Sequence, residues 1–366
     1  MASWLAEGPP PLLLPETGNS KRKELPMPKV SVVTPSYNHA YFLPERVSSI
    51  LAQTFDDIEW IVIDDCSTDG SGEILKRLTE HDLRVKLFFN DKNMGMAATT
   101  KKAIELSSGK YIYRAESDDI CHLRFLERMV EVLDSNPNVG FVFCSSLHTD
   151  KVGHVWGGWR QGKRDYIRSG VETFRSLVLH NYIPGCNLVF SRRAHDSAGG
   201  FGIGPFKVAC DWHFCLRVCL YHDVGYIAEP LSYHRSHGSN LSMSLSKTFD
   251  LNLFFRETYE LLQDVFASIP DKHRELRNLQ GQAFRSLSLS HGSSLYIKAL
   301  LTGKWDIARE ISKRIEHYDP GAIRGLDWIK ACVRCIVIGG VYHYLYTPIA
   351  RASNFRKSHF PVYANE

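Results

Sequence analysis

The feature that most constrains how this chain folds is the regular alternation of short apolar runs with helix-forming segments in its first half. The apolar runs occupy residues 30–34, 60–63, 85–89, 111–113 and 139–143, and the helical stretches occupy residues 41–53, 73–80, 96–106 and 125–133. Strands that are apolar along their whole length are buried on both faces, as in a largely parallel sheet covered by helices. The pattern therefore predicts an α/β fold in which ligands bind at the carboxyl ends of the strands.

Later segments extend this domain with a less regular pattern. Residues 151–168 are rich in Gly, Trp, Arg and Lys, and they precede a predicted helix over 171–180. A strand near 188–190 and a helix after Asp211 follow. We interpret these segments as the second half of the same domain, which spans residues 27–245.

Both ends of the chain differ from this domain. Residues 1–26 are Pro-rich and aperiodic, which predicts a disordered N-terminal tail, and Met27 could be the true initiator. Residues 246–366 carry helical periodicity throughout, which predicts a helical C-terminal module. A chain of 366 residues is long enough for one large domain with such an appendage.

Charge and cysteine content exclude some partners and favour a cytoplasmic location. The 44 Lys and Arg residues against 40 Asp and Glu give an evenly mixed formal charge of +4, so we expect no nucleic-acid partner. The nine cysteines are scattered, and we find no secretory apolar segment before them, which favours reduced thiols in the cytoplasm. The pair Cys332 and Cys335 lies in an apolar helical stretch, where packing explains it better than a metal site.

The last predicted helix, residues 328–346, leaves two interpretations open. Its uncharged stretch from Cys335 to Tyr342 is well short of the roughly 20 apolar residues that cross a bilayer. The basic residues and tyrosines around this stretch would suit peripheral contact with the cytoplasmic face of a membrane. A C-terminal helix buried within the protein has the same pattern.

Polar and acidic residues follow three of the predicted strands. Residues 34–38 follow the first strand, residues 64–70 the second, and residues 116–119 the fourth. Because the carboxyl ends of parallel strands meet at one edge of a sheet, we expect the three loops to converge on one crevice.

The adjacent carboxylates Asp118 and Asp119 point to a cation. Two neighbouring negative charges at a sheet edge repel each other, and a divalent metal ion offsets that repulsion. Mg²⁺ or Mn²⁺ held by one or two carboxylates completes its shell with waters and phosphate oxygens. The alternative is a solvated turn that caps the helix beginning near Leu123.

Asp64 and Asp65 stand directly after the second strand. A strand-to-helix turn explains Ser67, Asp69 and Gly70 in the same segment, but it does not explain two carboxylates at this point. One of them could accept hydrogen bonds from a nucleobase imide or from ribose hydroxyls. Tyr37, in the neighbouring loop, could supply the ring on which the base stacks.

With these motifs in order, the sequence resembles the inverting family-2 glycosyltransferases of the GT-A fold, a Rossmann-like mixed α/β sheet flanked by helices. The resemblance covers residues 29–242 and rests on residues 30–38, 49–55, 63–71, 93–95, 108–112, 117–119, 199–201, 210–212 and 233–242. It implies that Pro35, Tyr37 and Asp65 surround a nucleotide base and ribose, with Asp65 the partner of a uracil-type imide. Asn38 and Asp64 belong to the same donor-binding loops.

The resemblance also implies roles for four residues at the metal and at the reacting bond. Asp119, with Asp118 beside it, would bind the Mn²⁺ or Mg²⁺ that carries the donor diphosphate. His237 would reach the metal or the diphosphate, although a histidine in a polar loop is the alternative. Asp211 falls where the family keeps its catalytic base, and inversion requires one such carboxylate. As an alternative, Asp211 suits the N-cap of the helix that follows it.

The sequence departs from the family pattern at two places. Glu116 stands where many members carry Asp at the start of the metal motif. The segment Thr99-Thr100-Lys101 replaces an Ala-Arg-Asn, so Lys101 or Lys102 would have to substitute for the missing arginine.

The aromatic residues Trp156, Trp159 and Trp212 suggest stacking on an acceptor sugar, although tryptophan is more often buried in a core. Together these features predict a metal-dependent inverting glycosyltransferase. We expect it to move a sugar from a nucleotide-diphosphate donor, UDP-linked, to a hydroxyl of a saccharide or lipid-linked acceptor. An inactive nucleotide-sugar-binding module is the alternative. An NAD-dependent Rossmann oxidoreductase is disfavoured because no Gly-x-Gly-x-x-Gly follows the first strand.

Overall fold

The protein is described here by a computed structural model that covers residues 27–206, 209–238, 257–333 and 335. The predicted N-terminal tail, residues 1–26, lies outside the described residues, as does most of the predicted last helix. Among the described helices, none combines the length and the apolar character that a bilayer span requires.

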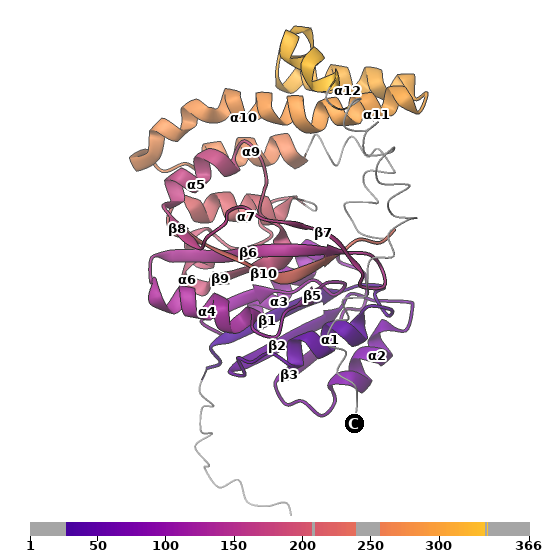
Figure 1. The fold of residues 1–366 in the computed structure, drawn as a ribbon, viewed down its shortest axis with the longest axis vertical. Coiled ribbons are helices and arrows are strands. Elements are labelled where there is room, and N and C mark those ends of the chain that lie inside the picture. Colours follow the sequence, from indigo (N-terminus) through magenta and orange to yellow (C-terminus); the bar gives the residue numbers. More distant parts are fainter. Residues whose placement is uncertain (1–26, 207–208, 239–256, 334, 336–366) are drawn as a thin grey trace, which may run out of the picture.

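The centre of the fold is one mixed sheet (Figure 1) with strand order β3-β2-β1-β4-β9-β6-β10-β5, to which β7 adds on β6 and β8 on β10. The strands are β1 Val30–Ser36, β2 Ile58–Asp64, β3 Val85–Phe89, β4 Tyr111–Arg114, β5 Ile120–Cys121, β6 Val139–Thr149, β7 Val155–Trp159, β8 Tyr166–Arg168, β9 Leu188–Ser191 and β10 Asp223–Arg235. β1 pairs in parallel with β2 and β4, and β2 pairs in parallel with β3. The expected α/β fold is therefore confirmed, and the loops after β1, β2 and β4 open at one edge.

The sheet is less parallel than its apolar runs suggest, because β9 runs antiparallel to both β4 and β6. A short 3-10 turn, Gly185–Asn187, leads directly into β9. Gly185 lies against the side chain of Arg114, which ends β4, so the turn sits at the carboxyl edge of the parallel strands. A strand that starts at this edge has to run back through the sheet, which reverses its direction.

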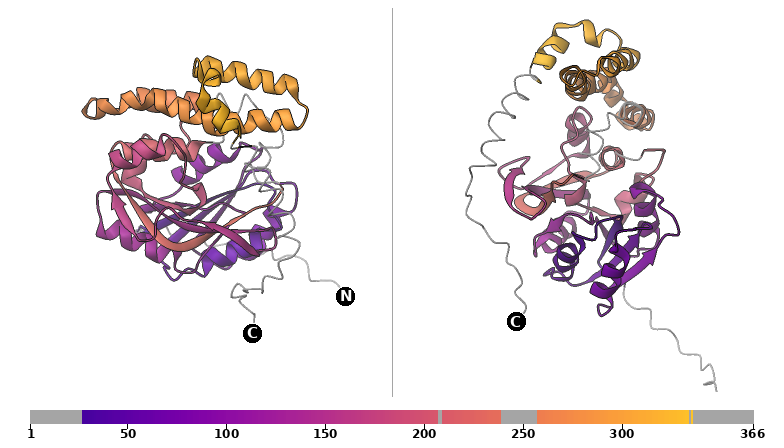
Figure 2. Two further views of the ribbon diagram at one scale, coloured as in Figure 1. Left: turned by 45° about the horizontal axis from the view of Figure 1, so that its top comes forward. Right: turned by 90° about the vertical axis from the view of Figure 1, so that its right-hand side faces the viewer.

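Two layers of helices cover the sheet, as the two views of Figure 2 show. The α-helices are α1 Leu43–Leu51, α2 Ser71–Thr79, α3 Met96–Glu105, α4 Phe125–Ser135, α5 Gly170–Leu177, α6 Arg192–Ser197, α7 Cys210–Cys219, α9 Glu257–Ala267, α10 Gln280–Leu287, α11 Ser293–Leu301 and α12 Trp305–Tyr318. One core contains side chains of α1, α2 and α4. The other contains α3, α5, α6 and α7. Alternation along β1 assigns Val30 and Val32 to the first core and Val33 to the second.

The C-terminal helices form a further layer that packs on α5 and α7 (Figure 1). Apolar side chains of α9, among them Tyr259, Leu262 and Val265, are buried in the same core as those of α7. A hydrogen bond of 2.7 Å between His213 Nε2 on α7 and Asp264 Oδ2 on α9 links the layers. The expected helical C-terminal region is thus present. A 3-10 turn at Asp271–Leu279 and a π-helical turn at Ser288–Gly292 connect its helices, and a 3-10 turn at Ala322–Arg324 leads from α12 to the helical residues 326–333.

Close approach of α5 to the end of α7 depends on Gly170. A Cβ at this position would lie 2.2 Å from the carbonyl oxygens of both Cys219 and His222. We expect Gly170→Ala to destabilise the protein by about 2–3 kcal/mol, because backbone atoms must move to admit the methyl group. Urea unfolding followed by circular dichroism measures this loss.

The matched control is Gly281→Ala on α10, where a Cβ would meet nothing within 4 Å. Since alanine is the better helix former, this variant should gain up to about 1 kcal/mol. Equal unfolding midpoints for the two variants would contradict the proposed close approach of α5 and α7.

Candidate active site

The loops after β1 and β2 are joined by hydrogen bonds into one surface. Asn38, which adopts a left-handed backbone with φ of 53°, accepts a hydrogen bond from the Thr68 amide at Oδ1, 2.8 Å away. Its own amide donates to Ser67 Oγ at 2.9 Å. The Ala40 amide donates to Asp69 Oδ2. Residues 67–69, which the sequence analysis assigned to a turn, therefore also fix the conformation of the loop that carries the exposed ring of Tyr37.

The carboxylates of Asp64, the last residue of β2, and of Asp65, directly after it, are both buried, which a plain solvated turn would not require. Asp64 Oδ2 accepts a hydrogen bond from the Ser67 amide at 3.0 Å. Asp65 accepts hydrogen bonds from the amides of Met94 at 2.9 Å and Gly95 at 2.8 Å. Asp65 thus holds the segment 93–95 against the end of β2.

Lys102 is connected to Asp65 through the side chain of Asn90. Its ammonium donates to Asn90 Oδ1 at 2.6 Å, and Asn90 Nδ2 donates to Asp65 Oδ1 at 2.7 Å. A positive charge therefore lies one residue away from Asp65, on α3, where the family pattern led us to expect an arginine. Of the two lysines considered, Lys102 is the one in this network.

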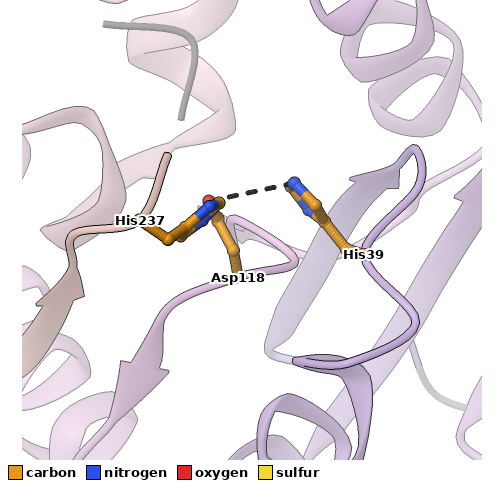
Figure 3. Close-up of side chains that lie close together, drawn as sticks. All are labelled: His39, Asp118 and His237. Atoms are coloured by element: carbon orange, nitrogen blue, oxygen red, sulfur yellow. Dashed lines mark hydrogen bonds and ion pairs between the residues drawn. The ribbon is translucent and has the colours of Figure 1, made fainter. Parts of the chain in front are cut away.

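A second group joins three loops around Asp118. His237 Nε2 lies 2.9 Å from Asp118 Oδ2, and His39 Nε2 lies 4.0 Å from the same oxygen. Figure 3 shows the three side chains pointing toward one another from the loop after β1, the loop after β4 and the end of β10. One ligand atom from each lies within 4.8 Å of the others, a spacing that could hold a metal ion.

His39 was missed by the sequence analysis. It directly follows Tyr37 and Asn38 at a strand end, and that position was the available signal. Its partners come from distant parts of the chain: Nδ1 is 2.6 Å from Ser117 Oγ, and its ring lies edge-on to that of His237. Although burial alone would raise the pKa of Asp118, the hydrogen bond to His237 and the proximity of His39 lower it.

Asp119 lies beside this group but outside it. Its Oδ1 accepts a hydrogen bond from the Arg235 amide at 2.8 Å, and its side chain is buried. Burial and the neighbouring charge of Asp118 raise the pKa of Asp119. Neither carboxylate caps α4, because Arg124 occupies the N-cap position of that helix. Within the described residues, Asp118 rather than Asp119 has metal-ligand spacing with His237.

Asp211 lies in the first turn of α7, one residue past its start, and its Oδ1 accepts a hydrogen bond from the Trp212 amide at 2.7 Å. Burial raises the pKa of Asp211, and the charge of Arg114 opposes that shift. Arg114 is itself buried and pairs with Glu116 at 2.5 Å. Glu116, the departure from the family motif, is therefore engaged with Arg114.

The loop after β4 connects the two parts of the site. Arg114 and Glu116 act on the charge of Asp211, and Asp118 and Asp119 follow two residues later. Gly185 packs between Arg114 and Asp211, since a Cβ there would lie 2.5 Å from Asp211 Oδ2 and 2.4 Å from Arg114 Nη2. The predicted convergence of the acidic loops on one edge of the sheet is what the structure shows.

The three candidate tryptophans have different surroundings. Trp212 is 5% exposed and donates its Nε1 hydrogen to the Leu177 carbonyl, so it is a core residue. Trp159 packs against Phe143 at the edge of the core. Trp156 is 47% exposed and remains available for a ligand.

Comparison with known proteins gives a consistent family assignment. The model of "Glycosyl transferase family 2" matches residues 31–198, which run from β1 to the end of α6. An uncharacterized glycosyltransferase of Haemophilus influenzae is 35% identical over 220 residues, covering 59% of this chain and 68% of that protein. TuaG of Bacillus subtilis is 38% identical over 106 residues, covering 29% of this chain and 42% of TuaG.

Among solved structures, Staphylococcus aureus TarS 1–349 in complex with UDP-GlcNAc superposes with a TM-score of 0.58 at 16% identity, covering 86% of this chain and 92% of that one. The same fragment without a named ligand gives a TM-score of 0.56 and covers 90% and 93%. These similarities show the fold, including the helices after the sheet domain. The H. influenzae relative is matched over two thirds of its length and shows the family. The chain accordingly belongs to the family-2 glycosyltransferases and has the GT-A fold.

Proposed function

We propose that the protein transfers a sugar from a UDP-linked donor to a hydroxyl of a saccharide or lipid-linked acceptor, with inversion at the anomeric carbon. The observation that carries the proposal is the position of Asp211, a half-buried carboxylate with a raised pKa at the same sheet edge as the His39, Asp118 and His237 group. The complex of TarS with UDP-GlcNAc, a protein of the same fold, supports the choice of a uridine nucleotide.

Three residues would hold a divalent cation. His39, Asp118 and His237 offer two imidazole nitrogens and one carboxylate oxygen. Mg²⁺ takes oxygen ligands almost exclusively, so this donor set suits Mn²⁺ better. When bound, such an ion would neutralise the negative charge that develops on the departing diphosphate. Asp119, which sequence analysis favoured as a ligand, would then contribute charge from the neighbouring position.

The donor nucleotide would lie on the surface formed by the first two loops. Tyr37 exposes 43% of its surface there, which leaves a face for the uracil ring. Asp65 Oδ2 accepts one hydrogen bond, from Gly95, and a carboxylate oxygen has a second lone pair for an imide N–H. Pro35, Asn38 and Asp64 would shape this site, chiefly by fixing the loops.

The transfer step needs one base. The acceptor oxygen attacks the anomeric carbon as the bond from that carbon to the diphosphate oxygen breaks, and the acceptor proton passes to Asp211. The charge of Arg114 favours the anionic form of the Asp211 carboxylate, and Glu116 balances the charge of Arg114. The partial burial of the carboxylate lowers the local dielectric, which strengthens its interaction with the acceptor hydroxyl.

A donor panel tests the proposal directly. Thermal shift and nucleotide release are measured with UDP- and GDP-sugars in the presence of Mn²⁺. We expect stabilisation by a UDP-sugar and slow release of UDP without acceptor. Binding with no release under any condition would instead indicate an inactive nucleotide-sugar-binding module.

The raised pKa of Asp211 has a consequence for the pH dependence of the rate. A base acts only when it is deprotonated, so kcat/KM falls as the pH drops through its pKa. Because burial raises this pKa above the ordinary value of 3.8, the loss should begin at a higher pH than an exposed aspartate would give. A profile of kcat/KM against pH, with folding followed by circular dichroism in the same buffers, measures the acid limb. A limb at or below the ordinary value would argue against Asp211.

A further inference from the structure

Trp156 occupies a β-bulge in the pairing of β7 with β6. In the pairing of β7 with β6, Val155 is opposite Thr149 and Gly157 is opposite His148, so Trp156 is the extra residue between them. Bulges of this kind redirect a side chain and occur frequently next to active sites. The ring centroids of Trp156 and His148 are 5.1 Å apart in an edge-on geometry, and Trp156 is 47% exposed.

A row of rings leads from this tryptophan toward the acidic loops. His148 on β6 is the register partner of His234 on β10, and their rings are 5.8 Å apart. His234 directly precedes Arg235, whose backbone amide donates a hydrogen bond of 2.8 Å to Asp119 Oδ1. Three adjacent strands, β7, β6 and β10 (Figure 1), thus carry Trp156, His148 and His234 toward the loop that contains Asp118 and Asp119.

Gly157 leaves space within this row. Its φ is not positive, and a Cβ on it would meet nothing within 4 Å, so neither backbone conformation nor packing requires glycine here. Its neighbour Gly158 is different, since a Cβ there would lie 3.0 Å from the Ser146 carbonyl oxygen. Glycine in a strand interior often marks a bulge, as at the adjacent Trp156, or a place where a ligand approaches the backbone, and the open space over Gly157 fits such an approach.

We propose that Trp156, Gly157, His148 and His234 form the acceptor subsite, and that this subsite binds a pyranose ring of a saccharide acceptor. The ring would stack its C–H face on Trp156 over Gly157, and the two imidazoles would hydrogen-bond its hydroxyls. Strands hold all four residues, and the row ends beside the acidic loops that contain the donor site. This inference rests on the proposed function and adds to it the choice of a saccharide over a lipid as the recognised acceptor group.

Two variants test the subsite from opposite directions. Trp156→Ala removes the stacking surface, and Gly157→Val fills the open space with a residue that suits a strand. The probes are methyl glycosides of glucose, galactose, N-acetylglucosamine and N-acetylgalactosamine, observed by saturation-transfer NMR with the full chain, Mn²⁺ and UDP. We expect ring protons of at least one glycoside to be saturated, and its affinity to fall about tenfold in both variants.

Ile167→Ala is the matched control, because Ile167 on β8 is also 47% exposed and lies outside the row. It should bind the glycoside like the parent protein, and all three variants should keep the parent affinity for UDP with Mn²⁺ and the parent melting temperature. Equal glycoside binding by all variants, or no binding by the parent protein, would overturn the subsite. Failure of UDP to bind the parent protein would instead overturn the proposed function, while glycoside binding that depends on Trp156 would still support a saccharide site.

Discussion

Asp211→Asn should abolish sugar transfer while UDP with Mn²⁺ still binds with an affinity close to that of the parent protein. Asparagine has nearly the same shape as aspartate but cannot take the proton of the acceptor hydroxyl. General-base catalysis contributes about 10²–10⁴-fold, so we expect kcat to fall by at least about 10²-fold. Nucleotide release measures the rate, and calorimetry measures binding.

The surroundings of Asp211 make this variant informative. Arg114 retains its pairing with Glu116 after the substitution, so the loss of one carboxylate does not leave a buried guanidinium without a counter-charge. The control is Asp264→Asn on α9. Asp264 pairs with His213, which lies on α7 like Asp211, and an asparagine oxygen can still accept a hydrogen bond from that histidine. The control should keep nearly full activity. Turnover retained by Asp211→Asn would refute the assignment of the base.

His39→Ala should weaken Mn²⁺ binding and, with it, transfer. Removing residues that merely orient a metal ligand costs about 10–100-fold in affinity, and loss of a ligand should cost at least as much. Free Mn²⁺ is quantified by electron paramagnetic resonance during titration. Transfer measured at saturating Mn²⁺ should recover in part if the loss lies in metal affinity.

His81→Ala is the control for this experiment. The His81 side chain is 91% exposed and pairs with Glu80 at the end of α2, away from the loops of the site. Its removal should leave Mn²⁺ binding unchanged. If His39→Ala also bound Mn²⁺ normally with an unchanged melting temperature, the group of His39, Asp118 and His237 would be a plain ion-pair cluster.

Much of the fold could be predicted because local patterns and global architecture agree. The runs at 30–34 and 60–63 became β1 and β2, and the helix expected after Asp211 became α7. The direction of β9 could not be predicted, because an apolar run of three residues looks the same in either direction. Its orientation depends on where the turn at Gly185–Asn187 is placed by packing.

The site, too, could be predicted from local patterns only in part. Acidic residues at strand ends identified the loops of Asp65 and Asp118, since strand periodicity already placed them at one edge. His39 carries only its position at a strand end as a signal, Lys102 was one of two candidates for the missing arginine, and Arg114 carries no signal of this kind in the sequence. Their roles depend on contacts with Asp118, Asp211 and Asn90, which lie on other elements.

The sequence by itself determined the α/β architecture, the loops that carry the chemistry and the family, because periodicity and short motifs are local properties of the chain. Tertiary structure alone decided which carboxylate faces the two histidines, which tryptophan stays exposed and what charge surrounds Asp211. Those outcomes depend on distances of a few ångströms between distant segments, and such distances are set by how the layers pack.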